Sequence, residues 1–264
     1  MYAPERHHQI VDTLDRVGRV SVAGLASDFG VTTETIRRDL DALEQVGRLR
    51  RVHGGAVPAG QSTVAESSLD ERLDRNAPQK DAIARAAIAL IPPTFRGSLL
   101  LDSGSSTGRL AELLIAWSPD QPGASVDVST NSIPLAARLH AAANPHLQLR
   151  TLGGAVRGIT GAAVGPTTIA QLSDIRPDLA FVGANGVSAE FGLSTPDETE
   201  ASAKAAMVHA ARRVVVLADS SKLDAESLVR FACLDEVDTL ITDAPPGPEL
   251  AEALADADVQ VVLA

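Results

Sequence analysis

The sequence has little of several residue types, and each scarcity excludes a class of protein. Only seven of its 264 residues are aromatic and only one is cysteine. Few aromatic rings argue against base stacking on single strands or RNA loops, and one cysteine excludes a disulfide framework or a cysteine metal cluster. No run of 18 apolar residues occurs, and the first ten residues lack the apolar core of a signal peptide. We therefore expect a cytoplasmic protein with no membrane partner, metal or cofactor.

Lysine is scarce as well, with three lysines against 20 arginines. They are Lys80, Lys204 and Lys222. A lysine ammonium is a compact point charge with a tunable pKa, which suits small anionic ligands, although chance placement on the surface is the alternative. The length and the 45% hydrophobic content predict two domains with a sizeable core.

The net charge of −11 is unevenly distributed along the chain. Residues 1–57 carry eight basic and eight acidic residues, which leaves 15 basic and 26 acidic residues for the remainder. The acidity therefore belongs to residues 58–264, while five arginines fall between positions 37 and 51. Because physiological salt screens charges beyond roughly 8 Å, a local basic patch can act independently of a distant acidic domain.

The stretch at residues 31–43, VTTETIRRDLDAL, has the pattern of a helix with one packed face. Ile36, Leu40 and Leu43 recur at the spacing of a single helix face. The opposite face carries Thr33, Glu34, Arg37 and Arg38. A short helix with a hydroxyl and arginine front is the shape that enters a DNA major groove.

Two further helices and a hairpin surround this stretch. Helices are predicted over residues 5–17 and 22–29, the second capped by Ser21, and Gly30 makes the turn into the third. Thr32 is predicted to cap the third helix and Gly47 to end it. The alternating residues 48–58, with a Gly-Gly turn, predict a β-hairpin wing. Residues 1–57 are thus expected to form a winged helix-turn-helix domain.

The motifs ERHHQI, VTTETIRRDL and GRLRRVHGGAV resemble the DNA-binding domain of the DeoR/GlpR family of bacterial transcriptional regulators. The resemblance implies that the third helix reads double-stranded operator DNA and that the wing lies beside it. The expected DNA-binding residues are Thr32, Thr33, Thr35, Arg37, Arg38, Arg50, Arg51 and His53. Three alternatives stay open. The two helix arginines could pair with Glu34 or Asp41, the threonines could only cap and fill, and the wing residues could fold back.

Residues 58–75 are interpreted as a linker with a connecting helix, and residues 76–264 as a second domain. In this domain short leucine-rich or β-branched runs alternate with alanine-rich helical stretches. The predicted strands are 98–101, 126–129, 147–151, 179–182, 214–218, 239–242 and 259–263. The alternation predicts an α/β fold with a mainly parallel sheet covered on both faces, whose ligands bind at the carboxyl ends of the strands.

Polar segments follow these strand ends and supply the candidate site. LDSGSSTGRL after the first strand combines a tight turn, hydroxyls and a helix N-terminus, which favours an anion site, although a capped helix is the alternative. The predicted effector-binding residues are Asp102, Gly104, Ser105, Ser106, Thr107, Thr130, Asn131, Gly153, Gly154, Asn185, Glu200, Lys204 and Lys222. Gly153 and Gly154 allow close approach of a ligand or of another strand. Glu200 and Lys204 could instead form a plain surface pair with each other.

This second domain also resembles the effector-sensing domain of DeoR/GlpR regulators, so the resemblance covers nearly the whole chain. That domain is related in fold to ribose-5-phosphate isomerase, which implies a phosphorylated sugar effector with its phosphate at residues 102–107. ESSLDERLDRNAPQKDAIARAA is similar to actinobacterial sugar-uptake regulators, which implies fructose phosphates. Where the isomerases carry acids, this chain has Asn185 and Ser188. A base without its partner acids is a poor isomerase, so we expect binding without turnover and no catalytic residues.

The leading hypothesis is a repressor of sugar uptake or metabolism genes that is controlled by a sugar phosphate. It is expected to work as a homodimer or homotetramer, because one helix reads too few base pairs and paired half-sites need a symmetric protein. An isomerase-like enzyme with a DNA-binding appendix is the alternative. A third class, an architectural DNA protein, would not respond to any sugar phosphate.

Overall fold

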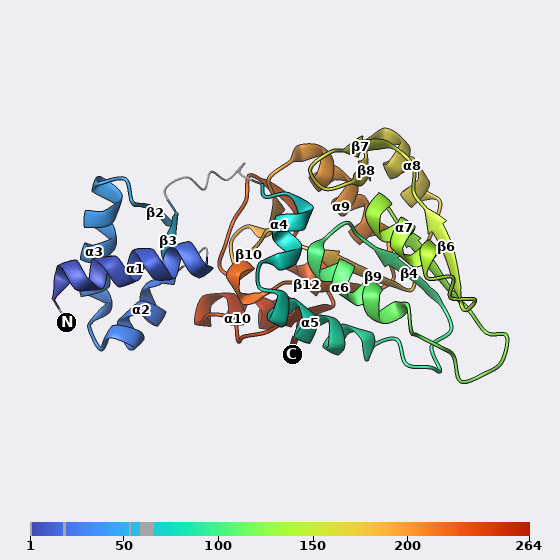
Figure 1. The fold of residues 1–264 in the computed structure, drawn as a ribbon, viewed down its shortest axis with the longest axis horizontal. Helices are drawn as coiled ribbons and strands as arrows, with labels where there is room; N and C mark the ends of the chain where they lie inside the picture. The colour runs from blue at the N-terminus through green and yellow to red at the C-terminus, as the bar shows by residue number, and fades with distance from the viewer. Residues whose placement is uncertain (1, 18–19, 53, 59–65) are drawn as a thin grey trace. The chain divides into compact units, whose positions relative to one another are not determined.

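The computed structural model describes residues 2–17, 20–52, 54–58 and 66–264. His53, one of the expected DNA-binding residues, lies outside the described residues. The chain divides into two compact units, Met1–Ala65 and Glu66–Ala264, and each is described by itself (Figure 1).

The first unit is a winged helix-turn-helix, as the sequence predicts. Its helices are α1 (Ala3–Val17), α2 (Val22–Phe29) and α3 (Thr33–Gln45). Its strands are β1 (Val20–Ser21), β2 (Leu49–Val52) and β3 (Gly55–Pro58), in the order β1-β3-β2. The predicted caps are confirmed, because Ser21 accepts from Gly24 N and Thr32 from Thr35 N, while Gly30 has a φ of 62°.

The core of this unit joins the three helices to the wing. Ile10, Ile36 and Leu40 are fully buried, and Leu49 of β2 is 2% exposed. The third strand β1 was not predicted; it pairs antiparallel with β3, so the wing is anchored to the residues just before α2. The wing and the helix-turn-helix thus share one sheet and one core.

The second unit is built on a seven-stranded parallel sheet of order β15-β14-β12-β9-β4-β5-β6 (Figure 1). Its strands are β4 (Ser98–Leu101), β5 (Val126–Thr130), β6 (Leu147–Thr151), β9 (Leu179–Gly183), β12 (Val214–Leu217), β14 (Thr239–Thr242) and β15 (Gln260–Leu263). All six neighbouring pairs are parallel. The seven predicted strands are confirmed within one residue at each end.

Helices cover both faces of this sheet, because successive residues of each strand point to opposite sides. Leu99 and Leu101 pack with α5 (Ala77–Ile88), α6 (Ser105–Leu114) and α7 (Ile133–Ala141). Leu100 between them packs on the other side, with α8 (Pro166–Ser173), α9 (Glu198–Ala210) and α10 (Pro248–Asp256). The central strands β4, β9, β12 and β14 are therefore buried on both faces, as their largely apolar sequences predict, whereas the edge strands β6 and β15 are more exposed.

Small elements that the sequence did not predict follow the carboxyl ends of the strands. They are the hairpin β7 (Ala155–Arg157) and β8 (Ala162–Val164), the antiparallel sheet of β10 (Gly186–Ser188), β11 (Gly192–Thr195) and β13 (Val229–Ala232), and the short helices η1 (Ser220–Lys222) and η2 (Leu234–Glu236). The connecting helix α4 (Leu69–Asp74) belongs to this unit and packs on α6. No helix among the described residues is long and apolar enough to cross a membrane.

Candidate functional site

The outer face of α3 presents the expected reading side chains to solvent. Thr33, Arg37 and Arg38 are exposed. Both arginines approach the carboxylate of Glu34, at 3.9 Å from Arg37 and 3.4 Å from Arg38, with more than half of each side chain accessible. Exposed pairs of this kind contribute about 0.2–1 kcal/mol, so they leave both guanidiniums available to another anion.

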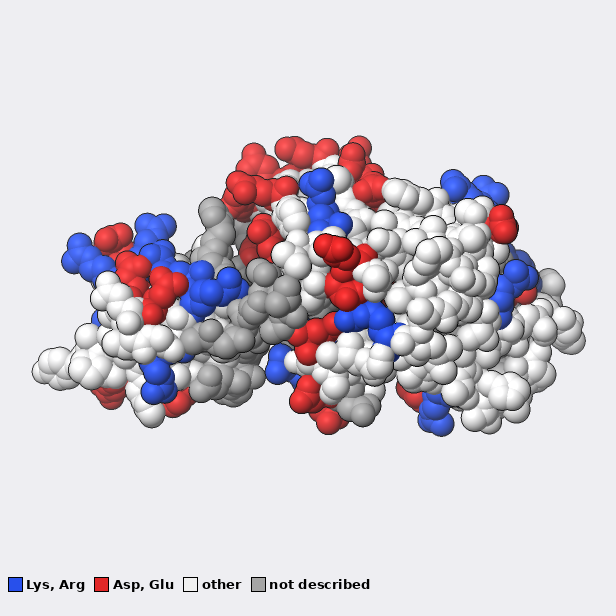
Figure 2. All heavy atoms as spheres, turned by 90° about the horizontal axis from the view of Figure 1, so that it is seen from above, with Lys and Arg blue, Asp and Glu red and all other residues white. Residues whose placement is uncertain are grey.

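The two wing arginines differ. Arg51 is turned back onto α3, where its guanidinium binds Asp41 and its backbone N–H donates to Glu44 Oε1 at 2.7 Å. The fold-back alternative therefore describes Arg51, while Arg50 is exposed. On the face of this unit that Figure 2 shows, basic and acidic side chains lie side by side instead of forming one unbroken basic patch.

The α3 cap also engages two of the expected DNA-binding threonines. The hydroxyls of Thr32 and Thr35 lie 2.9 Å apart, and the Thr32 oxygen accepts from Thr35 N–H at 3.2 Å. Both hydroxyls thus take part in the helix start, whereas Thr33 is exposed and takes no part in this cap.

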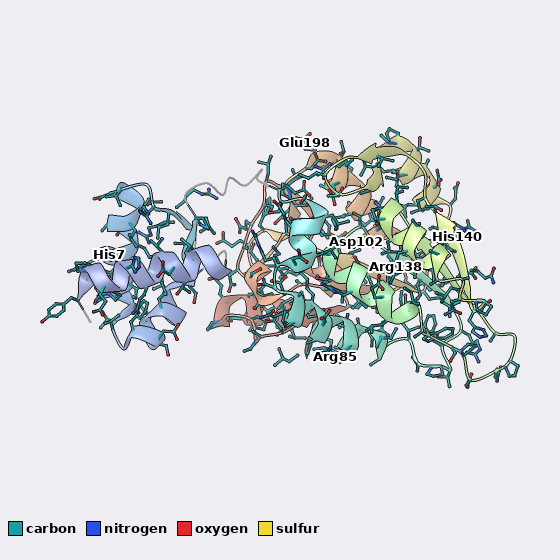
Figure 3. All side chains as sticks on the ribbon, viewed as in Figure 1. His7, Arg85, Asp102, Arg138, His140 and Glu198 are labelled. Atoms are coloured by element: carbon teal, nitrogen blue, oxygen red, sulfur yellow. The ribbon has the colours of Figure 1, made fainter. Side chains whose placement is uncertain are left out.

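A buried ion pair that sequence reasoning missed fixes the orientation of α3. Arg6 of α1 donates two hydrogen bonds to the carboxylate of Asp39, at 2.5 and 2.9 Å, and His7 Nε2 lies 2.9 Å from the same carboxylate (His7 is labelled in Figure 3). Burial raises the pKa of Asp39, but the bonds from Arg6 and His7 outweigh it and hold the pKa below its usual value. The sequence did contain a sign of this pair, because Asp39 is a charged residue on the packed face of α3, between Ile36 and Leu40.

In the second unit, Asp102 lies in the interior at the end of β4 (Figure 3). Its Oδ1 accepts from Gly104 N at 2.8 Å and from Thr107 Oγ1 at 2.6 Å. Its Oδ2 accepts from Gly183 N at 2.8 Å and from the ammonium of Lys204. Both carboxylate oxygens are therefore used by the protein, and Asp102 holds the loop in place.

Lys204 is equally engaged. Its ammonium binds Asp102 and donates to the Gly183 carbonyl at 2.9 Å, and it lies 5.5 Å from the centroid of the Phe231 ring. Burial raises the pKa of Asp102, but the nearby Lys204 charge outweighs it and lowers the pKa. The sequence-based pairing of Lys204 with Glu200 is thus replaced by a pair with Asp102. Asp102, Thr107 and Lys204 form the supporting layer under the loop.

At the N-terminus of α6, no side chain among the described residues caps the first-turn amides. Its N-cap is Gly104, which has no side chain to accept from the first-turn amides. Ser105 and Ser106 follow and are largely buried. A helix start without its own acceptor, combined with two hydroxyls, is suited to an anion.

A cluster of cations lies where α4, α5 and η1 meet. Lys80, 3% exposed, donates to the carbonyl of Arg72 and to that of Arg75 at 2.6 Å. Burial, together with the charges of Lys222, Arg72 and Arg75, lowers the pKa of Lys80 to about 8, against the attraction of Asp219. Burial also lowers the pKa of the half-buried Lys222, with Arg75 and Arg72 acting in the same direction. Cations that lower one another's pKa values repel one another, and a bound anion would stabilise their charged forms.

The sequence indicated Lys222 as a candidate but not its neighbours Lys80 and Arg72. The signal was present, because Lys80 is one of only three lysines. Lys80 lies near the start of α5 and far in the sequence from any strand end, so the sequence did not indicate which residues surround it. Asn76 makes the link between these elements, since its side-chain amide donates to Asp219 at 3.0 Å and to Ser221 at 3.3 Å.

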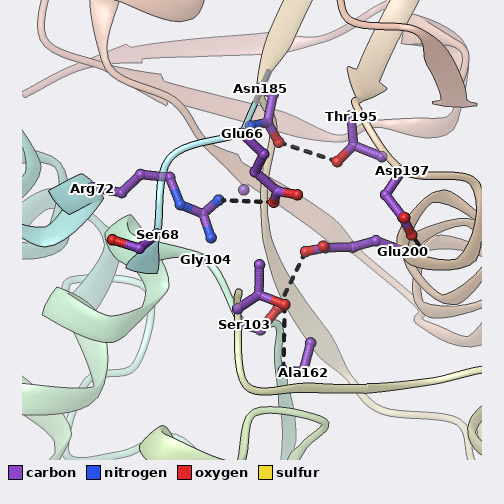
Figure 4. A network of polar contacts seen from close by, with 12 residues as sticks. Glu66, Ser68, Arg72, Ser103, Gly104, Ala162, Asn185, Thr195, Asp197 and Glu200 are labelled. Atoms are coloured by element: carbon purple, nitrogen blue, oxygen red, sulfur yellow. Dashed lines mark hydrogen bonds and ion pairs between the residues drawn. The ribbon is translucent and has the colours of Figure 1, made fainter. Parts of the chain in front are cut away.

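Glu200 belongs to a separate network (Figure 4). Its carboxylate binds the guanidinium of Arg157 from β7 and accepts from Ser103 at 3.4 Å. Arg157 also reaches Glu66 Oε2 at 2.9 Å and Asp197 Oδ2 at 3.4 Å. The network joins the loop before α6, the start of α9, the β7–β8 hairpin and the first described residue after the linker.

The remaining predicted residues hold local structure. Thr130 accepts from Ser132 N at 3.0 Å, and Asn185 Oδ1 accepts from Thr195 at 3.2 Å. At Gly154, φ is 155° and a Cβ would lie 2.6 Å from the Val164 carbonyl, so of the two alternatives it is the approach of another strand that this glycine allows.

Gly153 and Asn131 complete the set. Gly153 N–H donates to Gln171 at 3.0 Å. The Asn131 amide donates to the Ala163 carbonyl at 2.9 Å, whereas its buried Oδ1 has no hydrogen-bond partner among the described residues. That oxygen is an acceptor at the carboxyl end of β5 that a ligand hydroxyl can satisfy.

Comparison with known proteins assigns each of the two units to a domain family. Residues 6–61 match the DeoR-like helix-turn-helix domain, and residues 75–244 match the DeoR C terminal sensor domain. The chain is 36% identical to the HTH-type transcriptional regulator GlpR of Haloferax volcanii, over 99% of this chain and 98% of that protein. It is 32% identical to the putative aga operon transcriptional repressor of Escherichia coli O157:H7, over 98% and 93%. Ribose 5 phosphate isomerase A from Neisseria gonorrhoeae aligns with 54% of this chain and 52% of its own, at 14% identity and a TM-score of 0.37.

Proposed function

Because the chain belongs to the DeoR family of transcriptional regulators, we propose that it is a repressor of sugar uptake or metabolism genes whose operator binding responds to a phosphorylated sugar. The first unit binds the operator through the exposed face of α3, with Arg37, Arg38 and Thr33 as the reading side chains and Arg50 of the wing on the phosphate backbone. Two half-sites require a symmetric assembly, so the working form is a homodimer or homotetramer.

Two features of the second unit support a phosphorylated effector. The first is the N-terminus of α6, which has no side-chain cap, and the second is the cluster of Lys80, Lys222, Arg72 and Arg75. Ser105 and Ser106 supply hydroxyls and backbone N–H groups, while Lys222 and Lys80 supply charge. Both features favour a phosphate dianion, which accepts hydrogen bonds from helix donors and is attracted to cations. The unpaired oxygen of Asn131 and the Ser103 hydroxyl are suited to the sugar hydroxyls.

The same residues favour binding without turnover. An isomerase needs a free carboxylate to move a proton, and the Glu200 carboxylate is bound by Arg157. The positions where the isomerases carry acids hold Asn185 and Ser188, and Ser188 donates to Glu226 at 2.7 Å. An enzyme that converts sugar phosphates is therefore the weaker proposal.

The test uses the full-length protein and an operator that the protein itself selects from random DNA duplexes. Gel shifts are measured with D-fructose 1-phosphate, D-fructose 6-phosphate, glycerol 3-phosphate and ribose 5-phosphate, each matched with its unphosphorylated sugar or polyol. We expect one phosphate ester to change operator affinity by about tenfold, within the range of measured couplings, and its unphosphorylated partner to have no effect.

Two variants sharpen this test. Lys222→Met should abolish the response while leaving operator binding intact, and Arg85→Ala, which removes an exposed cation of α5, should leave both unchanged. Operator binding that no phosphate ester alters would leave only the architectural DNA protein. Conversion of ribose 5-phosphate that Glu200→Gln abolishes would establish the enzyme instead.

A further inference from the structure

Glu66 begins the second unit, and its carboxylate is held by cations of that unit (Figure 4). Its side chain is 5% exposed, with Oε2 at 2.9 Å from Arg157 and Oε1 at 3.8 Å from Arg72. A second tie lies close by, since Leu69 N–H donates to the Ile159 carbonyl at 3.1 Å. The residues that follow the DNA-binding unit in the chain are thus fastened to the sensor unit by a buried carboxylate.

Arg157 is crowded with carboxylates. Glu66, Asp197 and Glu200 all bind this one guanidinium, and Glu200 continues the network to Ser103 beside the α6 N-terminus. Three carboxylates are shared by Arg157 and Arg72, so the network holds more negative than positive charge. Glu66 is the member that comes from the connecting segment instead of from the sheet or α9.

Arg72 is incompletely satisfied. Its Nε and Nη2 atoms are buried and have no hydrogen-bond partner among the described residues, and its distance of 3.8 Å from Glu66 is too long for a hydrogen bond. The cations Lys80 and Lys222 are close enough for Arg72 to depress their pKa values. Arg72 therefore interacts both with Glu66, whose firmer hydrogen bond comes from Arg157, and with the cations Lys80 and Lys222, and its Nε and Nη2 remain unpaired among the described residues.

We propose that Glu66 is an internal anionic ligand of the sensor unit, which an anionic effector displaces by taking over Arg72. The inference rests on the proposed function and adds how the signal leaves the site. A phosphate that binds the free donors of Arg72 ends its attraction to Glu66 and brings further negative charge near that carboxylate. Glu66 then leaves the cluster, and the segment from Glu66 to α4, which follows the DNA-binding unit, loses one attachment.

Thermodynamic linkage between Glu66 and the effector determines whether loss of the Glu66 charge strengthens or weakens effector binding. If the effector and Glu66 exclude each other, removing the Glu66 charge must tighten effector binding by the factor with which Glu66 opposes it. The same change must shrink the effector's influence on operator affinity, because the attachment that the effector would release is already absent. A Glu66 that serves only as structure would act in the opposite direction, since its loss would loosen the site.

The experiment compares wild-type full-length protein with Glu66→Gln and with Asp74→Asn. Asp74 is exposed at the end of α4, the helix that follows Glu66, so Asp74→Asn removes an equal charge without touching the cluster. Inorganic phosphate is the first probe, followed by the four phosphate esters, with dissociation constants from thermal-shift titrations and calorimetry. We expect Glu66→Gln to bind the probe about fivefold or more tightly than wild type, and its operator affinity to change less on saturation. Asp74→Asn should match wild type, and Glu66→Asp, which keeps the charge, should lie between.

Three outcomes overturn the proposal. If wild type binds none of the probes, the effector function fails and this inference fails with it. If wild type binds a probe but Glu66→Gln binds it equally or more weakly, with unchanged unfolding of the second unit, only the internal ligand is refuted. If Glu66→Gln binds more tightly and keeps the full operator response, Glu66 competes for the site but transmits nothing.

Discussion

Lys204 and Asp102 form a buried ion pair although 102 positions separate them in the sequence. Neither side chain is more than 5% exposed. The pair ties α9 to the end of β4, and the same carboxylate receives Gly104 N–H, so it sets the conformation of the turn into α6. The geometry at the start of α6, where we propose that the effector phosphate binds, therefore depends on α9, which begins at Glu198.

Breaking this pair should destabilise the second unit strongly. Lys204→Met leaves the Asp102 carboxylate buried without its cation, a loss that typically costs about 3–5 kcal/mol. Urea unfolding of the full-length protein should show this loss, and Arg138→Met should leave the midpoint unchanged because Arg138 pairs with Glu112 on the surface. Lys204→Met with wild-type stability would mean that Asp102 is protonated in the folded protein.

Gly55 should be intolerant of a side chain. A Cβ at this position would lie 2.0 Å from the Val20 carbonyl oxygen, so Gly55→Ala must separate β1 from β3. Because Ser21 of β1 also caps α2, we expect a loss of roughly 1–3 kcal/mol in the first unit and weaker operator binding. Thermal unfolding and gel shifts measure both.

The matched control is Gly158→Ala, since a Cβ at Gly158 meets nothing within 4 Å. It should leave unfolding and operator binding unchanged. If Gly55→Ala behaves like Gly158→Ala, the β1–β3 pairing contributes nothing to the wing.

The sequence predicted the parts of the fold that depend on local pattern. Leu99, Leu100 and Leu101 form a short apolar run with turns on either side, and a strand buried on both faces needs no more than that. Capping was equally local, because the Ser21 and Thr32 hydroxyls bond amides only three residues further on. The strand β1 has two residues and no pattern of its own, so it was missed.

The site was predicted less well, because its partners are set by tertiary structure. Strand ends drew attention to the loop at 102–107 and to Lys222, whose role as an effector site stays a prediction. Nothing in the spacing of Glu200 and Lys204 on one helix face indicated that they bind Arg157 and Asp102, respectively, instead of each other. Arg72 and Glu66 lay in a stretch interpreted as linker and connecting helix, where polar residues are expected to be solvated. Glu66 is bound by Arg157 of the β7–β8 hairpin, which was not predicted.

Arg37 and Arg38 should contribute to operator binding, whereas a surface cation of the second unit should not. Either alanine substitution should weaken operator binding, by about 1–3 kcal/mol for a base contact, or with a salt slope reduced by about one for a phosphate contact. Gel shifts at several salt concentrations separate the two. Arg85→Ala is the control, and it should change neither affinity nor slope.

Arg51→Ala tests the folded-back arginine in the same series. Its guanidinium binds Asp41 in this structure, so we expect a smaller loss of affinity than for Arg37 or Arg38. A larger loss for Arg51 would show that it leaves Asp41 for DNA in the complex.

The lowered pKa of Lys80 predicts that the protein becomes more stable as the pH rises. Burial brings this pKa to about 8 from an ordinary value of 10.5, so between these limits the unfolded chain keeps a proton that the folded chain has released. Stability rises with pH wherever the unfolded state binds more protons, and the lowered pKa of Lys222 acts in the same direction. From pH 7.5 to 9.5, in buffers free of phosphate, urea unfolding should show a gain of about 1–2 kcal/mol.

Two controls connect this rise to the anion site. Lys80→Arg should remove most of it, because a guanidinium stays charged throughout the range. Saturating inorganic phosphate should also reduce it, because an anion beside Lys80 favours the ammonium form and restores its pKa toward the ordinary value. A rise that persists unchanged in Lys80→Arg would assign the titration to another group. A rise that is unaffected by phosphate in the wild-type protein would place the anion away from Lys80 and remove this lysine from the site.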